Sequence, residues 1–251
     1  MLLLLLKVIL APVFVLIGTV AGRRWGPRVG GFLAGFPNTA GPILFFIALE
    51  QGLRFGADTA AASLLGLVAL AAFALVYPWA ALRLPWWACL GAGWSAYIGV
   101  MLLLRHAHWP LGIEGLAALA ALGLARRLAP VLPPPGRGLR PRAWDLPLRA
   151  GVAICIVLGI TGAAAVLGPH WSGLLTPFPV TSATLAVFAQ IDGGAAAAEK
   201  MLKGILVGLN AVAVLMVVLA LTLPGWGLAG AFTAAFLAGG LLQLAQYFWH
   251  R

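Results

Sequence analysis

Two short motifs of similar composition, Phe36-Pro37-Asn38-Thr39 and Phe178-Pro179-Val180-Thr181, carry the side chains best suited to binding. Proline lacks an N–H and fits the first turn of a helix, so each motif predicts a helix start. A helix that starts inside a protein presents unpaired N–H groups and a positive dipole end, which together favour an anion. The alternative is that proline only kinks two packed helices. The predicted substrate-binding residues are Phe36, Pro37, Asn38, Thr39, Phe178, Pro179, Thr181, Ser182 and Thr184.

Four charged residues form a second candidate set. Lys7 and Glu50 lie toward the outer ends of two apolar runs, whereas Arg149 and Asp192 lie toward the inner ends of two later runs. Ionisable groups near a membrane are costly unless they are paired or hydrated. Two such pairs at opposite faces are what alternating gates would require, so we interpret all four as gating or coupling residues. The alternative is that they are interfacial side chains in ordinary salt bridges.

Other kinds of chemistry find little support in the sequence. It contains no His-Glu-x-x-His, no nucleophile elbow and no P-loop, so we do not expect an enzyme. His106 and His108 lack partners at metal-ligand spacing, and Cys89 and Cys155 lie inside apolar runs. We therefore expect no catalytic residue, no metal and no cofactor.

The composition decides what must position these groups. The chain has 251 residues, of which 63% are hydrophobic and 9% charged, whereas soluble proteins carry about 25% charged residues. The excess apolar surface must face lipid, and each membrane span needs roughly 20 apolar residues. The nine predicted spans are 2–21, 31–50, 59–77, 86–104, 111–125, 148–168, 172–191, 202–223 and 226–248.

The basic residues predict the orientation of these spans. The net charge of +10 would suggest nucleic acid in a soluble protein, but here the basic residues fall between apolar runs. With the N-terminus outside, thirteen Lys and Arg lie on the cytoplasmic side and three lie outside. Cytoplasmic loops are normally the basic ones. We therefore predict an outside N-terminus, a cytoplasmic C-terminus and no nucleic-acid partner.

An internal repeat is the most informative feature of the sequence. Shifted by 142 residues, Leu6–Gly52 aligns with Leu148–Gly194 without a gap, and about 15 of 47 positions are identical. Generic hydrophobicity can match leucine and alanine by chance, but not Phe-Pro-x-Thr together with two charged positions in register. The matched residues include Lys7 with Arg149, Thr19 with Thr161, Phe46 with Phe188, Glu50 with Asp192 and Gly52 with Gly194.

The offset predicts the geometry of the repeat. An odd number of spans separates the two repeat starts, so the second half enters the membrane from the opposite side. Inverted repeats of this kind are common in secondary transporters, where the site lies between the repeats near the midplane. We predict an all-α polytopic membrane protein with about nine transmembrane helices, in which helices 2 and 7 are broken. The domains are residues 1–110 (repeat 1), 111–147 (span 5 and a Pro/Arg-rich cytoplasmic linker) and 148–251 (repeat 2).

Each half resembles the four-span bacterial inner-membrane proteins of the GlpM family. The shared pattern is a basic residue entering the first span, then Gly31–Pro37 or Gly173–Pro179 entering the second, then an acidic residue before glycine. The resemblance implies a multi-pass protein of the bacterial cytoplasmic membrane and a connection with exopolysaccharide production. It also implies that relatives of single length could pair as antiparallel dimers, which this chain would fuse.

These features favour a transporter or lipid-carrier flippase that works by alternating access. Its partners would be the lipid bilayer and an anionic small molecule or lipid-linked phosphate, and the chain would act as a monomer or homodimer. A passive ion channel and a non-transporting scaffold for envelope or exopolysaccharide assembly are the alternatives.

The predicted orientation can be tested by cysteine labelling. After Cys89 and Cys155 are replaced by serine, an impermeant maleimide should modify Arg54→Cys but not Arg140→Cys in intact cells, because only position 54 faces outward. Permeabilised cells, in which both positions should react, are the control. The reverse pattern in intact cells would contradict the orientation.

Overall fold

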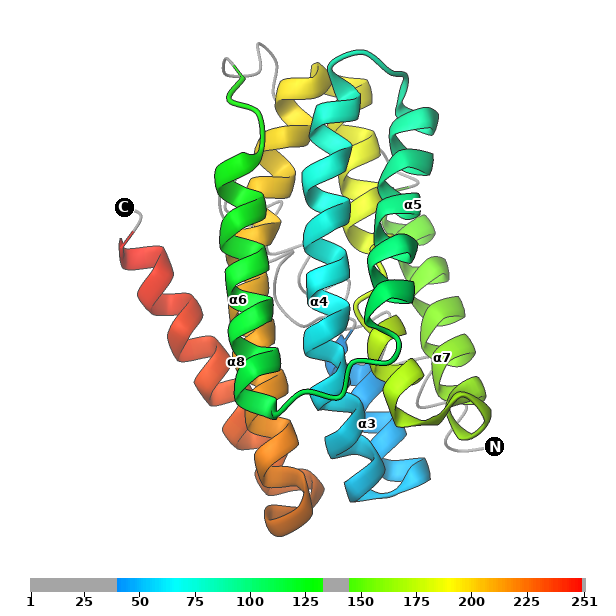
Figure 1. The fold of residues 1–251 in the computed structure, drawn as a ribbon, viewed down its shortest axis with the longest axis vertical. Coiled ribbons are helices and arrows are strands. Elements are labelled where there is room, and N and C mark those ends of the chain that lie inside the picture. The colour runs from blue at the N-terminus through cyan, green and yellow to red at the C-terminus, as the bar shows by residue number, and fades with distance from the viewer. Residues whose placement is uncertain (1–39, 133–144, 250–251) are drawn as a thin grey trace.

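The computed structural model describes residues 40–132 and 145–249, and every regular element in these two ranges is an α-helix (Figure 1). This agrees with the predicted all-α class. The helices are α3 (Ala40–Gln51), α4 (Leu53–Ala81), α5 (Trp86–Leu104), α6 (Leu111–Leu128), α7 (Asp145–Leu175) and α8 (Val180–Trp249).

Glycines in an extended, positive-φ conformation divide these helices. Gly52, with φ 97° and ψ 162°, separates α3 from α4. Gly168 (φ 75°, ψ 170°) divides α7, and Gly194 (φ 72°) and Gly227 (φ 68°) divide α8. This backbone region is essentially restricted to glycine. The continuous helical segments within α7 and α8 are therefore 145–167, 169–175, 180–193, 195–226 and 228–249.

The helix breaks follow the spacing of the sequence repeat. Gly52 and Gly194 lie 142 positions apart and share the same unusual backbone conformation. The next two helices have the same offset. Helix α5 begins at Trp86, and the last segment of α8 begins 142 positions later, at residue 228, after Gly227. The periodicity thus extends beyond Gly194, where the sequence alignment ended.

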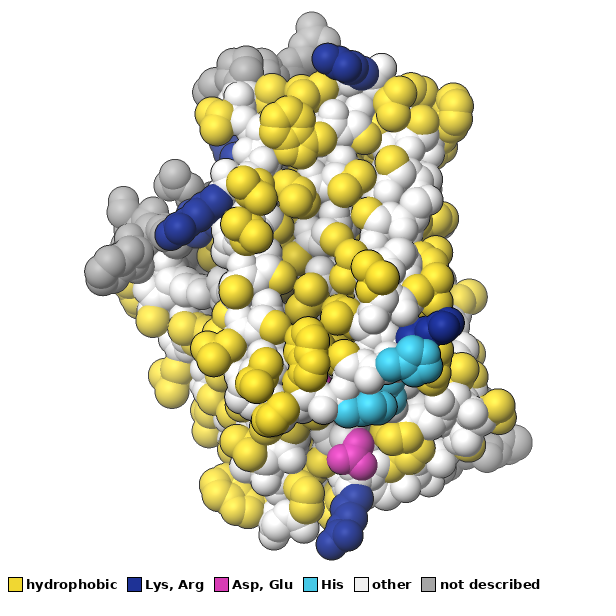
Figure 2. Space-filling model, viewed as in Figure 1, with side chains coloured by type: hydrophobic (Ala, Val, Ile, Leu, Met, Phe, Trp, Pro, Cys, Tyr) yellow, Lys and Arg dark blue, Asp and Glu magenta, His cyan; other side chains and the backbone are white. Residues whose placement is uncertain are grey.

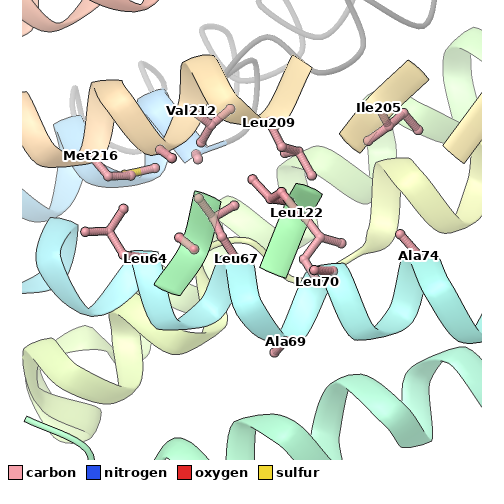
Figure 3. Packing of buried hydrophobic residues seen from close by; sticks show 14 of the residues in the cluster. Leu64, Leu67, Ala69, Leu70, Ala74, Leu122, Ile205, Leu209, Val212 and Met216 are labelled. Carbon is pink, nitrogen blue, oxygen red and sulfur yellow. The ribbon is translucent and has the colours of Figure 1, made fainter. Parts of the chain in front are cut away.

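Helix α4 is the centre of the bundle and packs against each of the other described helices. Its buried leucines, such as Leu64, Leu67 and Leu70, face Leu122 of α6 and an apolar stretch of α8 (Figure 3). In a lipid environment such side chains stabilise the bundle by van der Waals packing, because lipid tails are as apolar as leucine. The α8 side chains labelled in this cluster are Ile205, Leu209, Val212 and Met216.

The two repeat-related segments run in opposite directions along α4. A Cβ placed on Gly56 would lie 2.6 Å from the Cβ of Ala48, so α3 folds back antiparallel to α4. The 180–193 segment instead follows α4 in parallel. It starts after Pro177, which lies beside Gly66, and Gln190 near its end bonds Tyr77 at 2.9 Å. The aligned residues 40–51 and 182–193 are therefore antiparallel to each other.

The described surface is largely apolar. Hydrophobic side chains cover much of the face in Figure 2, and Lys, Arg, His, Asp and Glu are sparse there. Three stretches are long and apolar enough to cross a membrane: Leu53–Ala81, Trp86–Leu104 and Leu158–Gln246. The last contains three of the glycine breaks and the non-helical residues 176–179 between α7 and α8. These properties are consistent with a helical membrane protein. The nine-span count, the broken helices 2 and 7, the orientation and the type of membrane remain predictions.

Charged residues near span ends lie inside helices, not in the loops expected from hydropathy. Arg54 and Asp58 belong to the first turns of α4, which covers 53–81 instead of 59–77. Lys200 and Lys203 belong to the 195–226 segment, which was expected to start at 202. A span predicted from hydropathy ends at the first charged residue. A helix can continue past that residue, because its backbone hydrogen bonds do not depend on side-chain polarity.

Replacing Gly194 or Gly52 with alanine should destabilise the protein. A Cβ at either position would meet no atom of the described residues within 4 Å, so the cost arises only from the positive φ. We expect a loss of about 1–3 kcal/mol in each case, measured by unfolding in detergent micelles. Gly91→Ala is the matched control, because Gly91 is equally open but helical, and it should be neutral or slightly stabilising. Equal effects at Gly91 and Gly194 would contradict this account.

Candidate functional site

The second Phe-Pro motif lies in a break between two helices. Helix α7 ends at Leu175 and α8 begins at Val180. The N–H of Thr176 donates to the Ser172 carbonyl at 3.0 Å and closes the end of α7. The carbonyl of Pro179 accepts from the N–H of Ala183 at 3.0 Å and opens α8. Proline therefore stands where its missing N–H costs least.

The break is packed against the middle of α4 through glycines. A Cβ on Gly66 would lie 2.8 Å from the Leu174 carbonyl oxygen and from the Pro177 ring. A Cβ on Gly173 would lie 2.5 Å from Ala62. Neither position can hold a larger residue without movement, because real Cβ atoms do not approach so closely. These glycines bring the break into direct contact with the central helix.

Two aromatic residues of α5 hold the break from another side. The Tyr97 hydroxyl donates to the carbonyl of Leu174 at 2.6 Å, satisfying a backbone acceptor at the end of α7. The Phe178 ring lies 5.2 Å from the Tyr97 ring and 6.0 Å from the Trp94 ring, centroid to centroid. Phe178 is thus an anchor for the break. Sequence reasoning missed Tyr97 and Trp94, although their spacing of three places them on one helix face.

The hydroxyl groups of the predicted site have different roles. Thr184 donates to the carbonyl of Val180 in its own helix at 2.8 Å, so its hydroxyl proton already takes part in a hydrogen bond. Thr181 is half-buried and Ser182 is buried, and both occupy the first turn of α8. The first turn of a helix carries N–H groups with no intrahelical acceptor and about half a positive charge. Thr181 and Ser182 are therefore the predicted donors that lie at this helix start.

The first Phe-Pro motif, which comprises Phe36, Pro37, Asn38 and Thr39, lies outside the described residues, as does Lys7. That the two motifs face each other therefore remains a prediction. The first described residue after the motif, Ala40, is buried and begins α3.

The two acidic residues of the predicted gates lie toward opposite ends of α4. Glu50 is exposed near the end of α3, beside the start of α4. Asp192 is half-buried and lies two residues after Gln190, which bonds the far end of α4. Arg149 lies near the start of α7, and its side chain is outside the described part of the chain. The structure separates Glu50 from Asp192, while their pairing with Lys7 and Arg149 remains a prediction.

Polar contacts near Asp192 tie several helices together. The amide of Gln190 accepts from the Tyr77 hydroxyl at 2.9 Å and donates to the Leu84 carbonyl at 3.1 Å. Lys203 pairs with buried Glu199 and also donates to the carbonyl of Pro130 at 3.2 Å. The sequence signal for the ion pair was its i,i+4 spacing. These contacts link α4, α6 and α8 at this end of the bundle.

Comparison with known protein families, characterised proteins and solved structures found no significant match to this chain. The resemblance of each half to the GlpM family therefore remains a prediction.

The Tyr97 hydroxyl should be required for a stable break. Tyr97→Phe keeps the ring contact with Phe178 but leaves the buried Leu174 carbonyl without its hydrogen bond, at a cost of about 1–3 kcal/mol. Amide exchange by mass spectrometry should speed up in the peptide that covers the break. Tyr77→Phe is the matched control, because it removes a hydrogen bond near the end of the same bundle and should affect the Gln190 region instead. Identical exchange patterns in the two variants would contradict the assignment.

Proposed function

We propose that this chain is a membrane transporter or lipid-carrier flippase that moves a phosphate- or carboxylate-bearing substrate by alternating access. The observation that carries the proposal is the pair of aligned segments, 40–51 and 182–193, which run in opposite directions and each end at a positive-φ glycine. Inverted repeats build two similar half-sites that open to opposite faces, which is the geometric requirement of alternating access.

The substrate would bind at the paired Phe-Pro motifs. The start of α8 directly follows a non-helical segment packed at the middle of α4, so its N–H groups lie deep in the bundle. An apolar bundle holds little competing water, so hydrogen bonds to an anion there are strong. Thr181 and Ser182 would supply side-chain donors from this half, and Asn38 and Thr39 from the other. An anion could then bind without a buried lysine or arginine.

The charged residues would control access from the two sides. Glu50 and Asp192 lie toward opposite ends of the bundle, and we propose that Lys7–Glu50 closes the outer face while Arg149–Asp192 closes the inner face. An ion pair that forms in one state and separates in the other biases the equilibrium between them. Because each state would contain one of the two matched ion pairs, the two states would have similar free energies.

Transport can be measured in proteoliposomes that contain a fluorescent short-chain polyprenyl phosphate. A membrane-impermeant quencher reports movement of this probe between leaflets, and inorganic phosphate uptake tests a soluble anion. Thr181→Val combined with Ser182→Ala removes two donors, each worth roughly 1.5–3 kcal/mol toward a charged group. Apparent affinity for the transported probe should therefore fall at least about tenfold.

Thr184→Val is the control, because its hydroxyl already bonds its own helix, and it should transport normally. A rate that saturates and shows counterflow indicates a carrier, whereas a rate linear in probe concentration indicates a channel. Wild-type protein that moves neither probe, or a double variant with unchanged affinity, would contradict the proposal.

A further inference from the structure

Three histidines gather at one end of the bundle. His106 and His108 lie in the loop between α5 and α6, and His170 lies in the short 169–175 helix after the Gly168 break. The rings of His108 and His170 are 4.6 Å apart, centroid to centroid. Figure 2 shows histidine side chains beside acidic and basic ones on this face. The loop histidines and His170 are far apart in the sequence, and none of the three belongs to the proposed transport site.

His170 connects the short helix to the end of α5. Its ring hydrogen-bonds with the backbone carbonyls of Leu104 and Arg105, which close that helix. Its Nε2 atom is buried and has no partner among the described residues, so the nitrogen facing the carbonyls is Nδ1. A neutral ring with its proton on Nδ1 fits this site. Adding a proton to Nε2 would create a buried donor with no acceptor, which is costly.

We propose that the contact between His108 and His170 is a pH-sensitive latch, which holds the start of the 169–175 helix against the end of α5 at neutral pH and releases it in acid. His170 sits immediately after Pro169 and the Gly168 break, so the short helix has a hinge at its start. Its other end runs into the 176–179 break. Release of the latch would therefore loosen the start of the short helix, while Gly173 and Leu174 stay packed against α4 and α5.

The charges around His170 agree with this direction. Burial lowers the pKa of His170, and the neighbouring His108 and His106 lower it further, while the Leu104 and Arg105 carbonyls raise it. The net pKa lies below the ordinary value of 6.5, so the released ring binds more protons than the docked ring. The contact is thus fully stable above about pH 6.5 and weakens as pH falls below it.

The remaining charged groups come from the elements around the short helix. The loop also carries Arg105, whose Nε donates to His106 at 3.0 Å. Helix α4 contributes Arg54 and Asp58, both exposed, and α3 contributes Glu50. Glu114 in the first turn of α6 is buried and accepts a hydrogen bond from the Trp109 backbone. Besides burial, which is the largest cause, the groups that shift the pKa of His170 belong to the loop and the end of α5, not to these carboxylates.

Amide exchange of the full chain in lipid nanodiscs tests the latch. After correction for intrinsic rates, protection of the 169–175 peptide should fall at least about threefold between about pH 7.5 and about pH 5.5. His108→Asn removes the side chain that, after burial, most lowers the pKa of His170, and it should make this fall smaller. His106→Asn is the matched control, since His106 is a smaller influence on His170 and should largely retain the wild-type response.

Histidine NMR provides a second measurement that does not depend on the short helix being released. His108→Asn should raise the pKa of His170, because His108 is one of the groups that lower it. His170→Asn keeps a donor at the Nδ1 position and should hold the helix docked at both pH values. Wild-type exchange that is independent of pH, or an unchanged response in His108→Asn, would overturn the proposal.

Discussion

A backbone N–H or C=O that leaves a helix inside an apolar bundle finds no water, so a neighbouring group must bond it. The break between α7 and α8 meets this requirement with contacts from distant parts of the chain. Tyr97 of α5 bonds the Leu174 carbonyl, and Thr176 bonds back to Ser172 through both its N–H and its hydroxyl. Glycines on α4 and in the short helix let the backbones approach closely enough for this to work. The position of the break, and of everything that follows it, depends on these contacts.

Much of the architecture could be predicted because it rests on local signals. Apolar run length predicted Trp86–Leu104 with the bounds that α5 has. The 142-residue offset predicted matched glycines, and Gly52 and Gly194 have matching backbone angles because only glycine tolerates them. Proline in Pro177-Phe-Pro179 indicated a helix start, and α8 begins at the next residue. These features need no knowledge of tertiary neighbours.

The interactions that hold the candidate site could not be predicted in the same way. Tyr97 and Leu174 are 77 residues apart, and nothing local to either residue indicates the other. The aromatic neighbours of Phe178, Trp94 and Tyr97, could not be predicted either, and its predicted role in substrate binding stays a prediction. Thr184 is a donor by residue type, and helical geometry directs its hydroxyl to the carbonyl four residues back. Residue type indicates what a side chain can do, whereas its neighbours decide what it does.

The short 169–175 helix has a consequence for how the protein is made. Seven helical residues extend about 10 Å, far too little to cross a bilayer unaided. The surface that receives this helix belongs to α4 and α5, which leave the ribosome first because synthesis proceeds from the N-terminus. Gly66 and Tyr97 are therefore already available when Gly173 and Leu174 emerge. During biogenesis the first half of the chain can act as an intramolecular template on which the second half completes its interrupted helix.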